Sequence, residues 1–201
     1  MIGKWNKSVI LTYIGLTLSI VGIILVLFGI DLKYVMICLI IAGICDLFDG
    51  TVARRCKRTK EEKEFGIELD SLVDVMSFIA LPLVLLASVN ASLFFIPIAI
   101  IYAIFGVARL AYFNIKIADS EKAIDSYIGL PVTYAALIFP LVFLLSYFVR
   151  NNLFIVIYNM ITLLVSVLFI LKIKVPKPRL VFSIILLLTA IVVTIIYLFV
   201  V

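Results

Sequence analysis

Seven apolar segments, each long enough to cross a bilayer, dominate this chain of 201 residues. A transmembrane α-helix needs roughly 20 predominantly apolar residues. The chain is 66% hydrophobic, whereas soluble domains are typically about 45–50% apolar. Its mean hydropathy is +1.33. The expected spans are residues 9–30, 33–54, 66–89, 92–115, 128–149, 153–171 and 180–200. The sequence therefore predicts an all-α, polytopic transmembrane helix bundle.

The basic residues gather in alternate loops between these spans. With the N-terminus in the cytoplasm, the inside loops hold fourteen lysines and arginines, and the outside loops hold Lys33 and Arg150. This asymmetry follows the positive-inside rule and accounts for the net charge of +5 without a nucleic-acid partner. The first apolar run exceeds a signal peptide's apolar region and lacks a clear cleavage site, so we expect a retained span. The prediction is a multi-pass protein of the cell membrane.

A proline-containing stretch, KIKVPKPR, precedes the last apolar segment. Prolines interrupt helices, so this segment is expected to be separate from the others. We expect a six-helix core in a membrane domain of residues 1–178. An appended C-terminal transmembrane helix, residues 179–201, is expected to lie outside the functional site.

Four aspartates lie in otherwise apolar surroundings around the second predicted loop. Asp46 and Asp49 are three residues apart near the end of the second span, and Asp70 and Asp74 are four apart near the start of the third. Each pair shares one face of a helix. Two antiparallel helices joined by a short loop bring both pairs to a similar depth, just inside the cytoplasmic boundary. Intramembrane acids are costly, and they mark a candidate functional site.

The chemistry of these side chains favours hard cations. Four carboxylates at close range cannot all stay ionised without positive charge between them. Carboxylate oxygens prefer Mg²⁺ or Mn²⁺, and the chain has no histidine and no CxxC pair for zinc. Two divalent cations would balance four carboxylates, and two-metal sites commonly clamp a phosphoryl group. The alternative is a set of acids at helix ends that pair with loop lysines.

The spacing of these residues resembles a known family. The pattern Asp46-x2-Asp49-Gly50-x2-Ala53-Arg54, followed by Gly66-x3-Asp70-x3-Asp74, is similar to the motif of the CDP-alcohol phosphotransferases. Eleven residues separate Arg54 from Gly66, more than is usual in the family, and we expect the extra ones in the polar loop. The stretches LDSLVDVMSF, ARLAYFN, YIGLPVTYAA and KIKVPKP resemble the phosphatidylserine synthase branch.

This resemblance implies an enzyme of phospholipid biosynthesis. Its expected reaction transfers a diacyl- or dialkyl-glycerol phosphate group from a CDP-lipid to the hydroxyl of L-serine and releases CMP. Two divalent cations, Mg²⁺ or Mn²⁺, would be bound by Asp46, Asp49, Asp70 and Asp74, and Asp74 would also accept the proton. The CDP moiety would contact Asp46, Asp49, Gly50, Ala53, Arg54 and Gly66. The resemblance also implies six core helices, a homodimer and a site that opens to the cytoplasm.

Arg109 is the basic residue that lies well inside a predicted span, so it needs a partner. It can bind the serine carboxylate or a donor phosphate, or it can pair with a motif aspartate for structural reasons. Asn114 is a second candidate contact to serine. Other acceptors, inositol phosphate or glycerol phosphate, remain alternatives within the family. A divalent-cation transporter remains an alternative from another class.

Overall fold

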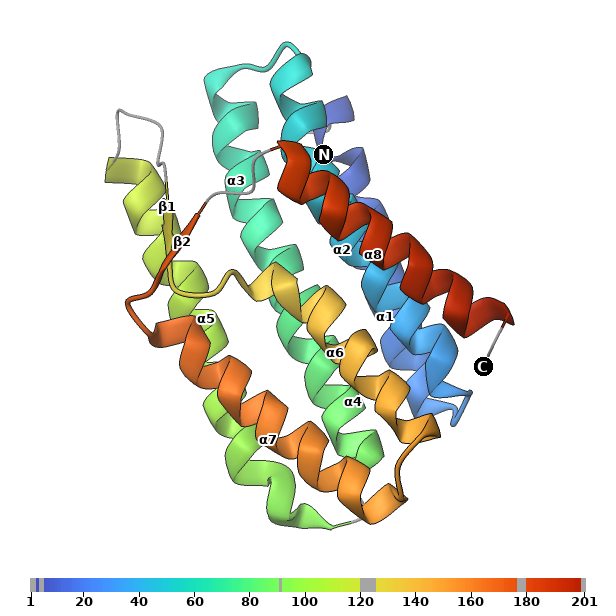
Figure 1. Cartoon of the computed structure of the whole chain (residues 1–201). Helices are drawn as coiled ribbons and strands as arrows, with labels where there is room; N and C mark the ends of the chain where they lie inside the picture. Colours follow the sequence, from blue (N-terminus) through green and yellow to red (C-terminus); the bar gives the residue numbers. More distant parts are fainter. Residues whose placement is uncertain (1–2, 4–5, 91, 120–125, 177–179, 200–201) are drawn as a thin grey trace.

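The structure, a computed structural model, describes residues 3, 6–90, 92–119, 126–176 and 180–199, and it is a bundle of long helices (Figure 1). The α-helices in chain order are α1 (Ile10–Leu27), α2 (Leu32–Arg55), α3 (Lys60–Asp74), α4 (Leu81–Val89), α5 (Ile96–Asp119), α6 (Ala135–Phe143), α7 (Asn151–Ile170) and α8 (Leu180–Phe199). The predicted all-α bundle is therefore confirmed.

Short elements connect or extend these helices. They are the 3₁₀ turns η1 (Lys7–Val9), η3 (Leu93–Phe95), η4 (Val132–Tyr134) and η5 (Leu144–Tyr147), and the π-helical segment η2 (Val75–Ala80). Two strands, β1 (Ser126–Ile128) and β2 (Lys174–Pro176), pair antiparallel with Ser126 opposite Pro176. The sequence predicted no strands, and it placed these two segments in loops or at the end of a span.

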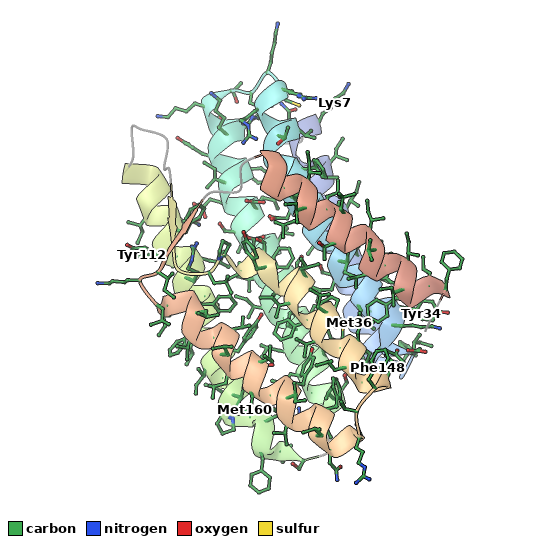
Figure 2. The ribbon with its side chains drawn as sticks, in the orientation of Figure 1. Lys7, Tyr34, Met36, Tyr112, Phe148 and Met160 are labelled. Carbon is green, nitrogen blue, oxygen red and sulfur yellow. The ribbon has the colours of Figure 1, made fainter. Side chains whose placement is uncertain are left out.

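Within the part of the chain that the structure describes, five helical segments are long and apolar enough to cross a membrane. They are Lys7–Leu27, Leu32–Arg55, Lys60–Val89, Leu93–Ile115 and Asn151–Ile170, and two shorter apolar helices cover Val132–Tyr147 and Ser183–Phe199. Large apolar side chains such as Phe148 and Met160 project from the outside of the bundle (Figure 2). The chain is a multi-pass membrane protein.

The third transmembrane segment begins earlier than the sequence suggested, at Lys60 instead of residue 66. A capping box starts it: the Glu62 backbone N–H donates to Thr59 Oγ1 at 3.2 Å, and the Thr59 N–H donates to Glu62 Oε2 at 2.7 Å. These bonds satisfy N–H groups that a helix start leaves without partners. The polar residues between Arg54 and Gly66 therefore lengthen α3 more than they lengthen the loop.

Helix α2 lies at the centre of the half of the bundle that carries the aspartates. It packs against α1 on one side and against α6 and α8 on the other. Small residues allow the close approach, as is common between membrane helices. A Cβ added to Gly15 of α1 would lie 3.5 Å from Cys45 Cβ, and one added to Gly43 would clash with Ala136 of α6. The position of α2 is thus tightly constrained.

A π-helical turn directly follows Asp74. Pro82 has no N–H, so the Phe78 carbonyl cannot form the usual α-helical bond to residue 82. The buried Tyr102 hydroxyl of α5 donates to that carbonyl at 2.7 Å. The widened turn is therefore stabilised by a neighbouring helix, and such turns occur frequently at functional sites.

Candidate active site

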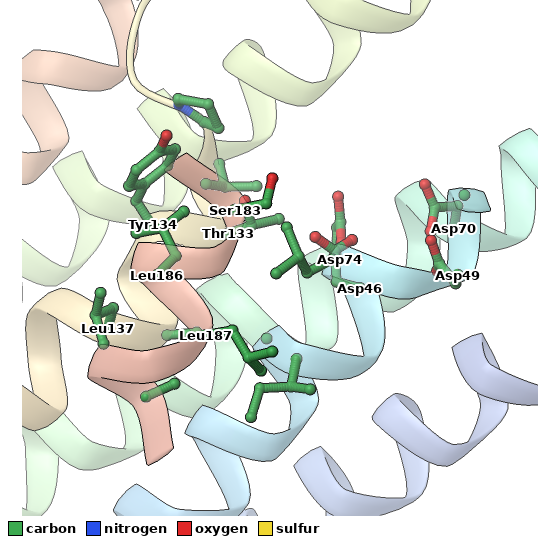
Figure 3. A pocket seen from close by; sticks show the side chains of 18 of the residues that line it. Asp46, Asp49, Asp70, Asp74, Thr133, Tyr134, Leu137, Ser183, Leu186 and Leu187 are labelled. Carbon is green, nitrogen blue, oxygen red and sulfur yellow. The ribbon is translucent and has the colours of Figure 1, made fainter. Parts of the chain in front are cut away.

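The four motif aspartates meet between α2 and α3, as predicted. The connection between these antiparallel helices is short, so both aspartate pairs lie at the same level (Figure 3). Asp46, Asp49 and Asp70 each present one oxygen, and these three oxygens lie within 4.8 Å of one another. The carboxyl groups also face each other across the two helices, Asp46 beside Asp74 and Asp49 beside Asp70 (Figure 3).

This geometry fits a metal ion. Asp49 is 8% exposed and Asp74 is 9% exposed, so little water can solvate their charges. Carboxylates this close together need a proton or a cation between them. The donors are oxygen atoms only, which suits hard divalent cations. Asp46, Asp49 and Asp70 can therefore hold a metal ion.

The aspartates line one wall of a cavity of about 390 Å³. Gly50, Thr51 and Arg54 of α2 continue this wall, and Arg109, Leu110 and Phe113 of α5 also border the cavity. The opposite wall is mainly apolar and comes from the segment that starts α6 and from α8 (Figure 3). The cavity thus combines a charged end with an apolar side.

Two arginines border this cavity. Arg54 Nη2 donates to Thr51 Oγ1 at 2.9 Å, and a Cβ added to Gly50 would lie 3.5 Å from Arg54 Nη1. Gly50 therefore leaves room beside this guanidinium. Arg109 is only 5% exposed, and its guanidinium carbon lies 5.1 Å from the centre of the Phe113 ring. Both guanidinium groups can therefore contact an anionic ligand that binds beside the aspartates.

Three of the predicted site residues do not line the cavity. Neither Ala53 nor Gly66 is among the residues that line it. Gly66 lies beside Arg58, whose Nη1 would be 3.8 Å from a Cβ added to the glycine. The Asn114 amide donates to Ser71 Oγ at 2.7 Å and so links α5 to α3. The structure thus places these three residues around the cavity and not on its surface.

The last helix contributes to the cavity, although the sequence suggested that it lies outside the site. Ser183, Leu186, Leu187 and Ala190 of α8 line the apolar wall. Their spacing of three, four and seven residues places them on one face of a helix, so the pattern was visible in the sequence. The proline-containing stretch before α8 indicated a break in the helix but carried no information on where the helix packs.

Sequence reasoning also missed residues before α6. Thr133 and Tyr134 border the cavity opposite the aspartates (Figure 3). They belong to η4, which follows the β1 strand, and Gly129 at the end of that strand has φ +77. A side chain at Gly129 would approach the Phe169 carbonyl oxygen to 2.5 Å. The position therefore requires glycine, and this tight turn directs the chain toward the cavity.

Several known proteins are similar to this chain. One is the CDP-diacylglycerol–serine O-phosphatidyltransferase of Helicobacter pylori (strain ATCC 700392 / 26695). It is 36% identical over 128 residues, which are 60% of this chain and 52% of that protein. The protein of the same name from Methanocaldococcus jannaschii is 34% identical over 134 residues, 67% of this chain and 59% of that protein. The archaetidylserine synthase of Methanothermobacter thermautotrophicus is 32% identical over 102 residues, 50% of this chain and 42% of that protein.

The chain spans about half the length of the curated relatives it matches. The family model described as CDP-alcohol phosphatidyltransferase matches residues 5–196, which include both aspartate pairs and most of α8. The chain belongs to the CDP-alcohol phosphatidyltransferase family.

Proposed function

We propose that this protein transfers a phosphatidyl-type group from a CDP-lipid to the hydroxyl of L-serine. The products are CMP and phosphatidylserine or its dialkyl analogue, archaetidylserine. One observation carries the proposal: both halves of the aspartate motif meet in one cavity, beside Arg54 and opposite an apolar wall. The names of the relatives from Helicobacter, Methanocaldococcus and Methanothermobacter support serine as the acceptor.

The aspartates form the proposed donor site. Asp46, Asp49 and Asp70 would hold one divalent cation, Mg²⁺ or Mn²⁺, and Asp46, Asp70 and Asp74 would hold a second. Bound cations supply positive charge that stabilises the pyrophosphate oxygens and makes CMP a better leaving group. Arg54 is always charged and offers a planar fork to a phosphate oxygen. Gly50 borders the cavity beside Arg54 and belongs to the proposed surroundings of the CDP moiety. Ala53 and Gly66 stay predicted CDP contacts, although they lie outside the cavity wall.

The apolar wall suits the lipid part of the donor. Leu137 of α6 and Leu186, Leu187 and Ala190 of α8 face the same cavity as the aspartates. A CDP-lipid has a charged head and an apolar body, so it matches a cavity with one charged end and one apolar side. We therefore assign the lipid chains to this wall, which makes α8 part of the substrate site.

The acceptor reacts from the side of α5. The serine hydroxyl oxygen forms the new bond to the lipid-linked phosphorus, and the bond from that phosphorus to CMP breaks. Asp74 accepts the hydroxyl proton. Arg109 orients the serine carboxylate through a bidentate pair. Asn114 stays a predicted serine contact, although both its amide nitrogen and its amide oxygen lie within hydrogen-bonding distance of Ser71 Oγ.

The charge of the cavity favours serine over phosphorylated acceptors. Among the described residues that line the cavity, Arg54 and Arg109 are the cationic ones. With Arg54 on the donor, inositol phosphate or glycerol phosphate would have Arg109 alone for its phosphate. A cation-transport path would gain nothing from two arginines beside the aspartates, because like charges repel.

The same proposal includes the cellular setting. The fourteen-to-two distribution of basic loop residues supports a cell-membrane protein with its N-terminus and site facing the cytoplasm. We also propose a homodimer and surrounding membrane lipid as partners. The division into a membrane domain, residues 1–178, and an appended helix, residues 179–201, remains a prediction.

One assay tests the function. Purified protein receives Mn²⁺ or Mg²⁺, a CDP-diacylglycerol or its dialkyl analogue, and one acceptor at a time: L-serine, inositol phosphate or glycerol phosphate. We expect CMP release with serine, and a serine phospholipid identified by mass spectrometry. CMP release only with a phosphorylated acceptor would replace serine by that acceptor. Mn²⁺ flux into proteoliposomes without any CMP release would favour a transporter.

A further inference from the structure

A threonine outside the family motif touches the aspartate cluster. Thr12, near the start of α1, donates a hydrogen bond from Oγ1 to Asp49 Oδ2 at 3.2 Å. Both residues are buried, at 7% and 8% exposure. They are separated by 37 residues in the chain and come from two different helices. The contact therefore arises from the packing of α1 on α2.

Other contacts hold α1 in place beside the cluster. Gly15 lies close to Cys45 of α2, at 3.5 Å from an added Cβ. Ser19 Oγ donates to Ser77 Oγ at 2.7 Å, in the π-helical turn that follows Asp74. Thr12, Gly15 and Ser19 are all buried and lie on one face of α1. The Thr12 hydroxyl is thus held against the helices that carry the aspartates.

The bond of Thr12 differs from the bond that threonine usually makes in a helix. Thr17, on the same helix, donates to the Tyr13 carbonyl four residues earlier, which is the local alternative. A hydroxyl has one hydrogen to donate, and Thr12 gives it to the Asp49 carboxylate. This bond holds one oxygen of the Asp49 carboxylate, which also faces Asp70 of α3.

We propose that Thr12 is a positioning residue of the metal site, which orients the Asp49 carboxylate for binding a divalent cation. The inference rests on metal binding by the aspartates, as in the proposed function, and does not depend on the acceptor. Hydrogen bonds that orient a metal ligand typically contribute about 10–100-fold to metal affinity. Thr12 restricts the rotation of Asp49 and stabilises its buried negative charge.

The test measures Mn²⁺ binding to the purified, substrate-free protein by electron paramagnetic resonance of the free ion. Thr12→Val keeps the size and removes the hydroxyl, and Thr12→Ser keeps the hydroxyl. Thr17→Val is the matched control, because it removes a hydroxyl from the same helix that bonds only to backbone. We expect the Kd for Mn²⁺ to rise about 10–100-fold in Thr12→Val and to stay near the wild-type value in the other two variants.

Several outcomes would overturn the proposal. One is a wild-type Kd in Thr12→Val. Another is an equal loss in Thr12→Ser, which keeps the hydroxyl and would show that the hydroxyl alone does not set the affinity. The third is an equal loss in Thr17→Val. If Thr12→Val does not fold, Thr12→Cys, a weaker donor, is expected to give an intermediate Kd, and a wild-type Kd would refute the role. Wild-type protein that binds Mn²⁺ but releases no CMP would defeat the proposed function and leave this inference standing.

Discussion

Removing the hydroxyl of Tyr102 is expected to destabilise the bundle more than the same change at another buried tyrosine. Tyr102 donates to the Phe78 carbonyl, which Pro82 deprives of its α-helical donor. Tyr197 donates to the Pro140 carbonyl at 2.6 Å, but that carbonyl also accepts from the Leu144 backbone N–H. Both tyrosines are fully buried. The two sites therefore differ in whether the carbonyl keeps its α-helical donor after the hydroxyl is lost.

The expected magnitudes follow from this difference. A buried polar group that loses its partner costs about 1–3 kcal/mol, whereas the net loss of an ordinary hydrogen bond is about 0.5–1.5 kcal/mol. The ring of Tyr102 keeps its contacts with Phe139 and Phe169, at centroid distances of 5.7 Å and 5.4 Å, in the phenylalanine variant. A loss of about 2 kcal/mol corresponds to roughly 4–8 °C in Tm for a chain of this size. Tyr197→Phe should lower Tm by about half as much.

The chain provides its own reporter for this measurement. Cys38 and Cys45 are free and buried, whereas Cys56 is partly exposed. In a Cys56→Ser background, a thiol-reactive dye labels the two buried cysteines only as the protein unfolds. Thermal scans of the background protein, Tyr102→Phe and Tyr197→Phe in one detergent give the comparison. Equal Tm shifts in the two variants, or an unchanged Tm in Tyr102→Phe, would refute the argument from Pro82.

Three further predictions concern activity. CMP release should fall to background in excess EDTA and return with Mn²⁺ or Mg²⁺, because the aspartates offer only hard ligands; full release in EDTA would contradict this. Asp46→Asn and Asp70→Asn should each reduce turnover several hundred-fold, which corresponds to a rise of about 4 kcal/mol in the activation free energy. Asp31→Asn is the control, because Asp31 caps the other end of α2, and it should leave turnover unchanged. Near-normal turnover of either aspartate variant at saturating metal would contradict the metal-binding role of that residue. Arg109→Lys should raise the KM for serine at least tenfold, on the order of one charge-assisted hydrogen bond, and leave the KM for the CDP-lipid nearly unchanged. A defect in the CDP-lipid KM would instead assign Arg109 to the donor.

Much of the site could be predicted because its parts are local. Asp46 with Asp49, and Asp70 with Asp74, each share a helix face by spacing alone, and a short connection brings the two faces together. The capping box at Thr59 and Glu62 was also local and visible, but the sequence interpretation assigned these residues to a loop. The same holds for the apolar face of α8, whose spacing was readable although its packing partner was not.

Other features could not be predicted because they join distant parts of the chain. The hydrogen bonding of Asn114 with Ser71 joins α5 to α3, and the spacing of the two residues in the sequence did not indicate it. The Thr12 hydroxyl has a local carbonyl within reach by sequence, as Thr17 does, and nothing in the pattern indicates that it bonds Asp49 instead. A polar side chain has several partners of similar energy, and the positions of neighbouring helices select one.

The sequence by itself determined the membrane bundle and the two aspartate pairs, because hydropathy and helical spacing are properties of consecutive residues. Only the tertiary structure decided that α8 lines the cavity, that Tyr102 donates to the Phe78 carbonyl, and that Thr12 donates to Asp49. The physical reason is the packing of helices in three dimensions. Close approach at small residues such as Gly15 and Gly43 sets the distances between helices, and these distances select which distant side chains meet.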